Sequence, residues 1–318
     1  MLIATILFIL GLLCLIKGGD WFVDGATGIA ERFHVPEILI GATVVSIGTT
    51  IPEVMVSSAS ALMGHGEIAY GNAIGSIICN CSLIAAITIA FRPGRIEPSS
   101  LKTPLFFFFL ASAIYMVSAY LFGFFSRPVG FFLLLLFLLY MLLTVKKAVS
   151  SGRGEERDEA ESRISRHILL LVLGAALIAL GANLLIDNGT IIARELGVPE
   201  SVIALTFIAL GTSLPELVTA ITALVKGHSD LSLGNVIGAN LFNLVLVSGL
   251  ATVLSPFTLP QGKLAFGMNA SLVVDIPLML SVMLIMTVPA LLKGRLYRAQ
   301  GVLLLLIYAS FCLFQFVS

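Results

Sequence analysis

The chain has 318 residues, of which 58% are hydrophobic and only 11% are charged. Soluble domains contain about 45–50% apolar and about 25% charged residues, so this composition excludes a soluble globular enzyme, a disordered segment and a coiled coil. The net charge of zero gives no reason to expect a nucleic-acid partner. The mean hydropathy of +1.07 indicates a helical protein that crosses a membrane many times.

Apolar runs of about 20 residues are long enough to cross a bilayer as helices. The chain has ten such runs, at about 2–31, 37–63, 68–91, 103–123, 128–146, 166–195, 200–225, 231–254, 274–292 and 298–317. The first is too long for a cleaved signal peptide and lacks a basic start, so we interpret it as a membrane helix. The ninth begins at Asp275-Ile276-Pro277, where we expect Asp275 to cap the helix at the membrane surface.

A hydrophilic linker, residues 150–164, separates the predicted helices into two groups of five. Its acidic residues lack the spacing of a calcium-binding EF-hand loop. With ten spans, fourteen of the 18 Lys and Arg residues fall on the linker's side of the membrane, three on the other side, and Lys17 within the first span. Basic residues concentrate on the cytoplasmic side of membrane proteins. The sequence therefore predicts a multi-pass protein of the cell membrane with a cytoplasmic linker and both termini outside.

The chain repeats itself after 163 residues. Of the 73 positions from 11 to 83, 23 are identical to the residue 163 positions later. The matches include Gly48-Thr49-Thr50-Ile51-Pro52-Glu53 with Gly211-Thr212-Ser213-Leu214-Pro215-Glu216, and Gly71-Asn72-Ala73-Ile74-Gly75-Ser76 with Gly234-Asn235-Val236-Ile237-Gly238-Ala239. Because each copy holds an odd number of spans, the second must enter the membrane from the opposite side, as in secondary transporters. We therefore predict an all-α membrane protein of ten helices in two inverted five-helix repeats, 1–149 and 165–318, with the motifs at about 41–83 and 204–246.

Glu53 and Glu216 lie in the middle of their predicted spans. An ionised carboxylate at that depth costs several kcal/mol unless it is paired or solvated. Apart from Lys17, no Lys or Arg lies in the middle of a span, so we expect the partner to be a mobile cation. The alternative is a buried pair of protonated acids that serves only the structure.

The residues around the two glutamates add oxygen ligands. Pro52 and Pro215 each remove an amide donor, and Gly48 and Gly211 permit unusual backbone angles, so we expect both helices to be interrupted here. An interruption would free carbonyl oxygens, and further oxygens come from hydroxyls and from amides of the third and eighth spans: Ser46, Thr49, Thr50, Ala209, Thr212, Ser213, Asn80 and Asn243. Hard cations such as calcium favour such a set, whereas zinc and copper favour His and Cys.

These paired motifs resemble those of the calcium:cation antiporter superfamily, specifically the compact prokaryotic form of the sodium/calcium exchanger family. The resemblance implies an antiporter and not an enzyme, without cofactors, in which spans 2, 3, 7 and 8 form a core and spans 1 and 6 slide against it. Calcium and sodium are the implied substrates, and no protein partner is predicted beyond the lipid bilayer. The implied ligands are Glu53, Glu216, Thr49, Thr212, Asn80 and Asn243, with Ser46, Ser76, Thr50, Ala209 and Ser213 at flanking sodium sites.

Three departures refine this resemblance. Proton-coupled members of the superfamily usually carry a Glu soon after the Gly-Asn of the third span, where this chain has Ser76 and, in the second motif, Ala239; this favours sodium coupling. Asn243 in place of an acid argues against potassium co-transport. Ala239 replaces a serine of many members and removes one hydroxyl from a flanking sodium site.

Three alternatives remain beside sodium/calcium exchange. A calcium/proton antiporter is possible on the same scaffold, because midplane glutamates can also bind protons. A membrane enzyme is disfavoured by the absence of Gly-x-Ser-x-Gly and His-Glu-x-x-His. A channel is disfavoured because inverted halves with acids at the midplane suit alternating access.

Overall fold

The computed structural model describes residues 2–151, 161–197, 211–261 and 264–317, and these are almost entirely helical. The first half contains α1 (Leu2–Arg32), α2 (Glu37–Ile40), α3 (Ser46–Leu62), α4 (Gly66–Cys79), α5 (Ala86–Phe91), α6 (Pro98–Val117) and α7 (Arg127–Ser151). The second half contains α8 (Glu161–Glu195), α10 (Leu214–Lys226), α11 (Ser229–Phe242), α12 (Ser248–Leu254), α13 (Ile276–Lys293) and α14 (Arg298–Val317). Within the spans lie the π-helical turns η1 (Gly41–Val45), η2 (Asn80–Ala85), η3 (Ser118–Phe122), η5 (Asn243–Val247) and η6 (Ser271–Asp275).

Nine helical stretches among the described residues are long and apolar enough to cross a membrane. They correspond to nine of the ten predicted spans. Of the seventh, residues 200–210 lie outside the described residues, and α10 forms its second part. Helices also occupy both ends of the predicted linker, since α7 ends at Ser151 and α8 begins at Glu161. At its second end, Glu161 and Arg163 are good helix formers.

The ninth span begins earlier than predicted. The turn η6 precedes α13, so Asp275 lies inside a continuous helical stretch. It has helical backbone angles (φ −64°, ψ −52°), and its side chain makes no capping hydrogen bond. Our expectation that Asp275 caps this helix was wrong, because the apolar residues before it continue the helix upstream.

The centre of the bundle is α11, all of whose residues from Leu231 to Phe242 are buried. The elements packed around it include α2, η1, α3, η2, α6 and α10. Outside this layer, α14 packs against α5 and η2, and α7 packs against α12 and η5. The helices that carry the predicted ligands are therefore the most deeply buried ones, whereas α7 and α14 cover them.

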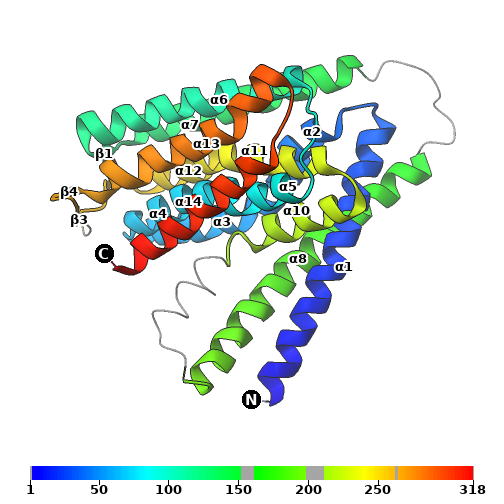
Figure 1. The fold of residues 1–318 in the computed structure, drawn as a ribbon, viewed down its shortest axis with the longest axis horizontal. Coiled ribbons are helices and arrows are strands. Elements are labelled where there is room, and N and C mark those ends of the chain that lie inside the picture. The colour runs from blue at the N-terminus through cyan, green and yellow to red at the C-terminus, as the bar shows by residue number, and fades with distance from the viewer. Residues whose placement is uncertain (1, 152–160, 198–210, 262–263, 318) are drawn as a thin grey trace.

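Helices α1 and α8 form a separate pair that crosses the direction of the other helices at a steep angle (Figure 1). Their backbones touch at glycines. A Cβ atom on Gly11 would meet the Gly181 oxygen at 3.0 Å, and one on Gly18 would meet the Gly174 oxygen at 3.0 Å. Gly174 and Gly181 are the residues 163 positions after Gly11 and Gly18, so both repeats supply the same contact. Small residues that permit such close approach are typical of tightly associated membrane helices.

Loops from the two halves meet on each face of the bundle. On one face Arg95 pairs with Arg295 as an isolated antiparallel bridge, and Nδ1 of His228 lies 2.8 Å from Oε1 of Glu37. We call this the basic face. On the other face, β1 (Phe124–Phe125) pairs antiparallel with β2 (Phe257–Thr258). After β2, the strands β3 (Leu264–Ala265) and β4 (Met268–Asn269) form a hairpin. Each contact joins loops that the predicted order of spans places on the same face.

Candidate cation site

Two buried glutamates from different halves form the centre of the candidate site. Glu53 comes from α3 and Glu216 from the first turn of α10, and neither side chain is exposed to solvent. The two helices that carry them, α3 and α10, pack against one another. None of their four oxygens has a hydrogen-bond partner among the described residues. Two like charges buried without donors are unstable unless a cation or protons neutralise them.

Asn80 and Asn243 stand at the same point of each half. Each is the first residue of a π-helical turn, η2 or η5. Both side chains are fully buried, and none of their amide oxygen and nitrogen atoms has a hydrogen-bond partner within the described chain. Such turns often occur at functional sites. The two amide oxygens are therefore available as neutral ligands.

Two threonines are held by hydrogen bonds that cross between the halves. The Thr49 hydroxyl donates to Oδ1 of Asn235 at 3.1 Å, and the Thr212 hydroxyl donates to Oδ1 of Asn72 at 3.1 Å. A shift of 163 residues converts one pair into the other. Asn72 and Asn235 are not among the predicted ligands, although both belong to the repeated motif. Their recurrence at equivalent positions was the signal that could have placed them at the site.

The flanking hydroxyls are not equivalent in the two halves. Ser213 and Ser76 place their hydroxyl oxygens 3.5 Å apart. The equivalent positions are Thr50 and Ala239; Ala239 has no hydroxyl, and the buried Thr50 hydroxyl has no partner in the described part of the chain. Ser46 donates to the carbonyl oxygens of Gly41 and Asn235, at 2.6 and 3.0 Å. Ala209 lies outside the described residues.

The backbone at the two motifs differs from the prediction in one half. From Glu37 to Leu62 the chain is one continuous helical stretch that includes Gly48 and Pro52, so the predicted interruption there was wrong. A proline removes only one amide donor, which leaves the Gly48 carbonyl without its usual helical partner while the helix continues. The irregular turn lies upstream, at η1. In the second half, Gly211, Thr212 and Ser213 form a turn before α10 begins at Leu214. The part of this span before Gly211 lies outside the described residues, so the interruption there stays a prediction.

A narrow cleft separates the α1–α8 pair from both proline motifs. Its lining includes Phe22 of α1, Ile178 of α8, and Thr49, Pro52 and Pro215 of the core. A Cβ on Gly48 would lie 3.0 Å from the Phe22 ring. The moving surface implied by the resemblance is therefore next to the candidate ligands.

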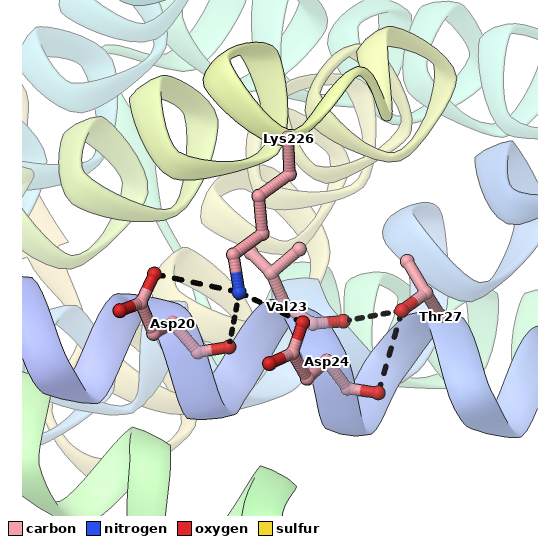
Figure 2. A network of polar contacts seen from close by, with 5 residues as sticks. All are labelled: Asp20, Val23, Asp24, Thr27 and Lys226. Atoms are coloured by element: carbon pink, nitrogen blue, oxygen red, sulfur yellow. Dashed lines mark hydrogen bonds and ion pairs between the residues drawn. The ribbon is translucent and has the colours of Figure 1, made fainter.

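On the basic-face side of this cleft, an ion pair joins α10 to α1 (Figure 2). Nζ of Lys226 lies 2.7 Å from Oδ1 of Asp24 and 3.4 Å from Oδ1 of Asp20, and it donates to the Asp20 backbone oxygen at 3.1 Å. The position equivalent to Lys226 in the first half is Met63. Methionine cannot form an ion pair, so the first half has no equivalent of this contact at position 63.

The donor set consists of carboxylate, amide and hydroxyl oxygens, which suits calcium or sodium. No group of three or more His, Cys, Asp or Glu residues that could hold a metal occurs in the described residues. His228 pairs with Glu37 on the basic face, and Cys81 accepts a hydrogen bond from Asn240 at 2.9 Å. His228 and Cys81 therefore each make a contact with a residue that is not a predicted ligand.

Comparison with known proteins identifies close relatives. The profile of a family described as "Sodium/calcium exchanger protein" matches residues 3–146 and 166–317. Inner membrane protein YrbG of Escherichia coli is 39% identical over 80% of this chain and 81% of its own length. Sodium/calcium exchanger MaX1 of Methanosarcina acetivorans is 30% identical over 98% of each chain. A solved structure of the sodium-calcium exchanger NCX_Mj, soaked with Na+ and Sr2+, superimposes with a TM-score of 0.82 at 30% identity over 97% of each chain.

Proposed function

Because the chain belongs to the sodium/calcium exchanger family, a family of cation/calcium antiporters, we propose that it couples calcium transport to an opposing flow of sodium. The observation that carries this proposal is the pair Glu53 and Glu216. Both are fully buried and come from equivalent positions in the two halves, and their carboxylate oxygens have no hydrogen-bond partner in the described chain. Two negative charges in such a place match one calcium ion or two sodium ions.

The proposed calcium ligands are the two carboxylates together with Thr49, Thr212, Asn80 and Asn243. The crossed bonds from Thr49 to Asn235 and from Thr212 to Asn72 support this assignment, because they fix the threonines and leave lone pairs on the hydroxyl oxygens. The remaining predicted ligands, Ser46, Ser76, Thr50, Ala209 and Ser213, are assigned to flanking sodium sites. Calcium takes six to eight oxygens. The proposed calcium and sodium ligands of both halves together offer more oxygens than that.

Two residues support sodium rather than protons as the coupling ion. Ser76 and Ala239 occupy the region where proton-coupled members usually have a Glu, so this region adds no carboxylate to the two central ones. The Ser76 hydroxyl lies 3.5 Å from Ser213 and can coordinate sodium. If the chain is instead a calcium/proton antiporter, those same carboxylates would carry the protons.

We propose that transport occurs by alternating access between two inverted repeats, 1–149 and 165–318. The family profile matches one segment on each side of the linker, which supports this division. The glycine contacts between α1 and α8 support movement of these helices as one unit along the cleft beside Thr49 and Pro52. The distribution of basic residues supports a cytoplasmic basic face and linker, with both termini outside.

The test is calcium uptake by the purified protein in liposomes, with sodium and proton gradients imposed separately. An outward sodium gradient should drive calcium uptake at constant pH, and a proton gradient without sodium should not. Uptake driven only by protons would replace sodium with protons in the proposal. Uptake driven by neither gradient would refute antiport by this chain.

A further inference from the structure

Two loops on the basic face carry a cluster of exposed cationic side chains. Residues 92–97 lie between α5 and α6, and residues 293–298 include the end of α13 and the start of α14. The cluster consists of Arg92, Arg95, Lys293, Arg295 and Arg298. The acid of these loops, Glu97, accepts a hydrogen bond from Ser99. The loops therefore present a strongly positive surface where four helix ends meet.

Backbone hydrogen bonds between the two loops hold Arg95 opposite Arg295. The amide of Ile96 donates to the Gly294 oxygen at 3.0 Å, and the amide of Leu296 donates to the Gly94 oxygen at 2.9 Å. These bonds flank Arg95 and Arg295, which are therefore a non-hydrogen-bonded antiparallel pair. In such a pair the Cα atoms are about 4.5 Å apart and the side chains are at their closest.

The alternation of side chains directs the paired arginines outward. The next residues, Ile96 and Leu296, are buried, while both arginines are exposed. Like charges directly opposite one another destabilise a pair of strands. Neither guanidinium has a carboxylate partner among the described residues; the Arg295 guanidinium instead lies 5.7 Å from the centre of the Tyr297 ring. An anion bound between the two guanidinium groups would offset their repulsion.

We propose that Arg95 and Arg295 bind the phosphate of an anionic phospholipid at the basic face. Guanidinium groups match phosphate oxygens with paired N–H donors. The loops lie at the ends of membrane-spanning helices, which places the arginines at the depth of lipid headgroups. Phe91 and Leu292, at or beside the helix ends, are largely exposed and apolar, and they offer a surface for the acyl chains. These features distinguish a lipid from free phosphate.

This inference does not depend on the proposed ion coupling. The bound lipid would tie the loop after α5 to the loop after α13, so it should stabilise the protein. Arg95 and Arg295 do not belong to the candidate cation site. Calcium transport in liposomes of neutral lipid therefore serves as a test of folding for variants at these positions.

The experiment measures the thermal unfolding of the full chain in detergent, with added phosphatidylglycerol, phosphatidylcholine or inorganic phosphate. Phosphatidylglycerol should raise the unfolding temperature of the unmodified protein by about 5 °C if it is present at about 100 times its Kd. The other two additives should raise it much less. The double variant Arg95→Gln/Arg295→Gln should lose most of the shift, and Arg95→Lys/Arg295→Lys should keep part of it. Arg127→Gln, a basic residue on the opposite face, should keep all of it.

Three results would overturn the proposal. One is an undiminished phosphatidylglycerol shift in the double glutamine variant. The second is an equal loss in Arg127→Gln, which would indicate a general effect of charge. The third is an equal shift with inorganic phosphate, which would indicate a simple anion site. If the glutamine variant does not transport calcium in phosphatidylcholine liposomes, the lysine variant and the single variants decide between these outcomes.

Discussion

The Thr49 hydroxyl donates a hydrogen bond to Oδ1 of Asn235, and this bond joins the motif of one half to that of the other. Thr212 makes the same bond to Asn72, again at 3.1 Å. Each asparagine therefore fixes the orientation of a threonine beside a buried glutamate. Because the hydroxyl proton is donated to the asparagine, the lone pairs of the threonine oxygen stay available to a cation. We assign Asn72 and Asn235 as residues that position the ligands.

Asn72→Ala and Asn235→Ala should each weaken calcium binding about three- to tenfold, which corresponds to the loss of one positioning hydrogen bond. Asn72→Ala should also lower the unfolding temperature more. Nδ2 of Asn72 donates to the Ser57 hydroxyl at 2.9 Å and to the Glu53 backbone oxygen at 3.3 Å, whereas Nδ2 of Asn235 has no acceptor in the described chain. The measurements are half-saturating calcium in liposome uptake and thermal unfolding.

The control for this pair is Asn188→Ala. It removes a buried amide that donates to the Leu184 oxygen within α8, and it should leave the calcium affinity unchanged. If both motif variants bind calcium as well as the unmodified protein, Asn72 and Asn235 do not position ligands.

Glu53→Gln and Glu216→Gln should each reduce calcium exchange by about 100-fold or more. Removal of one charge leaves a buried calcium ion incompletely neutralised, and an uncompensated buried charge costs about 3–5 kcal/mol. The measurement is sodium-driven uptake of radioactive calcium by folded, purified variants. Glu67→Gln, which changes an exposed glutamate at the start of α4, should transport normally. Substantial flux in either central variant would contradict the assignment of that carboxylate.

The internal repeat of the sequence predicted which polar residues lie at equivalent, buried positions of the two halves. Glu53, Glu216, Asn80 and Asn243 stand out because polar residues recur within apolar spans, and the structure buries all four. The crossed pairing of Thr49 with Asn235 could not be read from spacing, because it depends on how α3 packs against α11. The ion pair of Lys226 with Asp24 likewise joins residues 202 positions apart.

Local backbone geometry was less predictable. The glycine and proline of Gly48–Pro52 predicted an interruption of the helix. The helix continues there, and the irregular turn η1 lies upstream. Nothing in the composition of Gly41–Val45 distinguishes a π-helical turn from an α-helix. The same applies to η6, which extends the ninth span beyond Asp275. The turn η1 packs against α11 of the other half, a contact that the local sequence does not reveal.

Lys226→Met should ease opening on the basic face. The change introduces the residue found at the equivalent position 63 and removes the ion pair to Asp20 and Asp24. Partly exposed ion pairs contribute about 0.2–1 kcal/mol, and a site that is open more often has a lower apparent Kd. Half-saturating calcium on the basic face should fall about two- to fivefold in vesicles of defined orientation. Lys102→Met, which removes another exposed cation, should leave it unchanged; an equal change in both variants would exclude a specific role for the pair.

Ala239→Ser should strengthen sodium binding about three- to tenfold, since one added hydroxyl ligand contributes about 1 kcal/mol. The added group would stand where Ser76 stands in the other half, and the buried Thr50 hydroxyl, which lacks a partner in the described residues, would gain one. The measurement is the sodium dependence of calcium exchange. Ser76→Ala, the opposite change at the equivalent position, should weaken sodium binding. Unchanged sodium dependence in Ala239→Ser would remove position 239 from the proposed flanking site.

Exchange should be electrogenic, with more than two sodium ions for each calcium ion. Glu53 and Glu216 carry two negative charges, which one calcium or two sodium ions neutralise, and charge balance alone would therefore give an electroneutral cycle. The ligands argue for a third sodium: the amides of Asn80 and Asn243 and the hydroxyls of both halves supply more oxygens than one calcium uses, without adding charge. Ala239 weakens one flanking site but leaves the Ser76–Ser213 pair intact. A third sodium makes the loaded site positive, so a membrane potential set with potassium and valinomycin should change the rate and the equilibrium of sodium-driven calcium flux. If reversal of the potential changes neither, the ratio is two to one and the flanking hydroxyls do not hold a third transported ion.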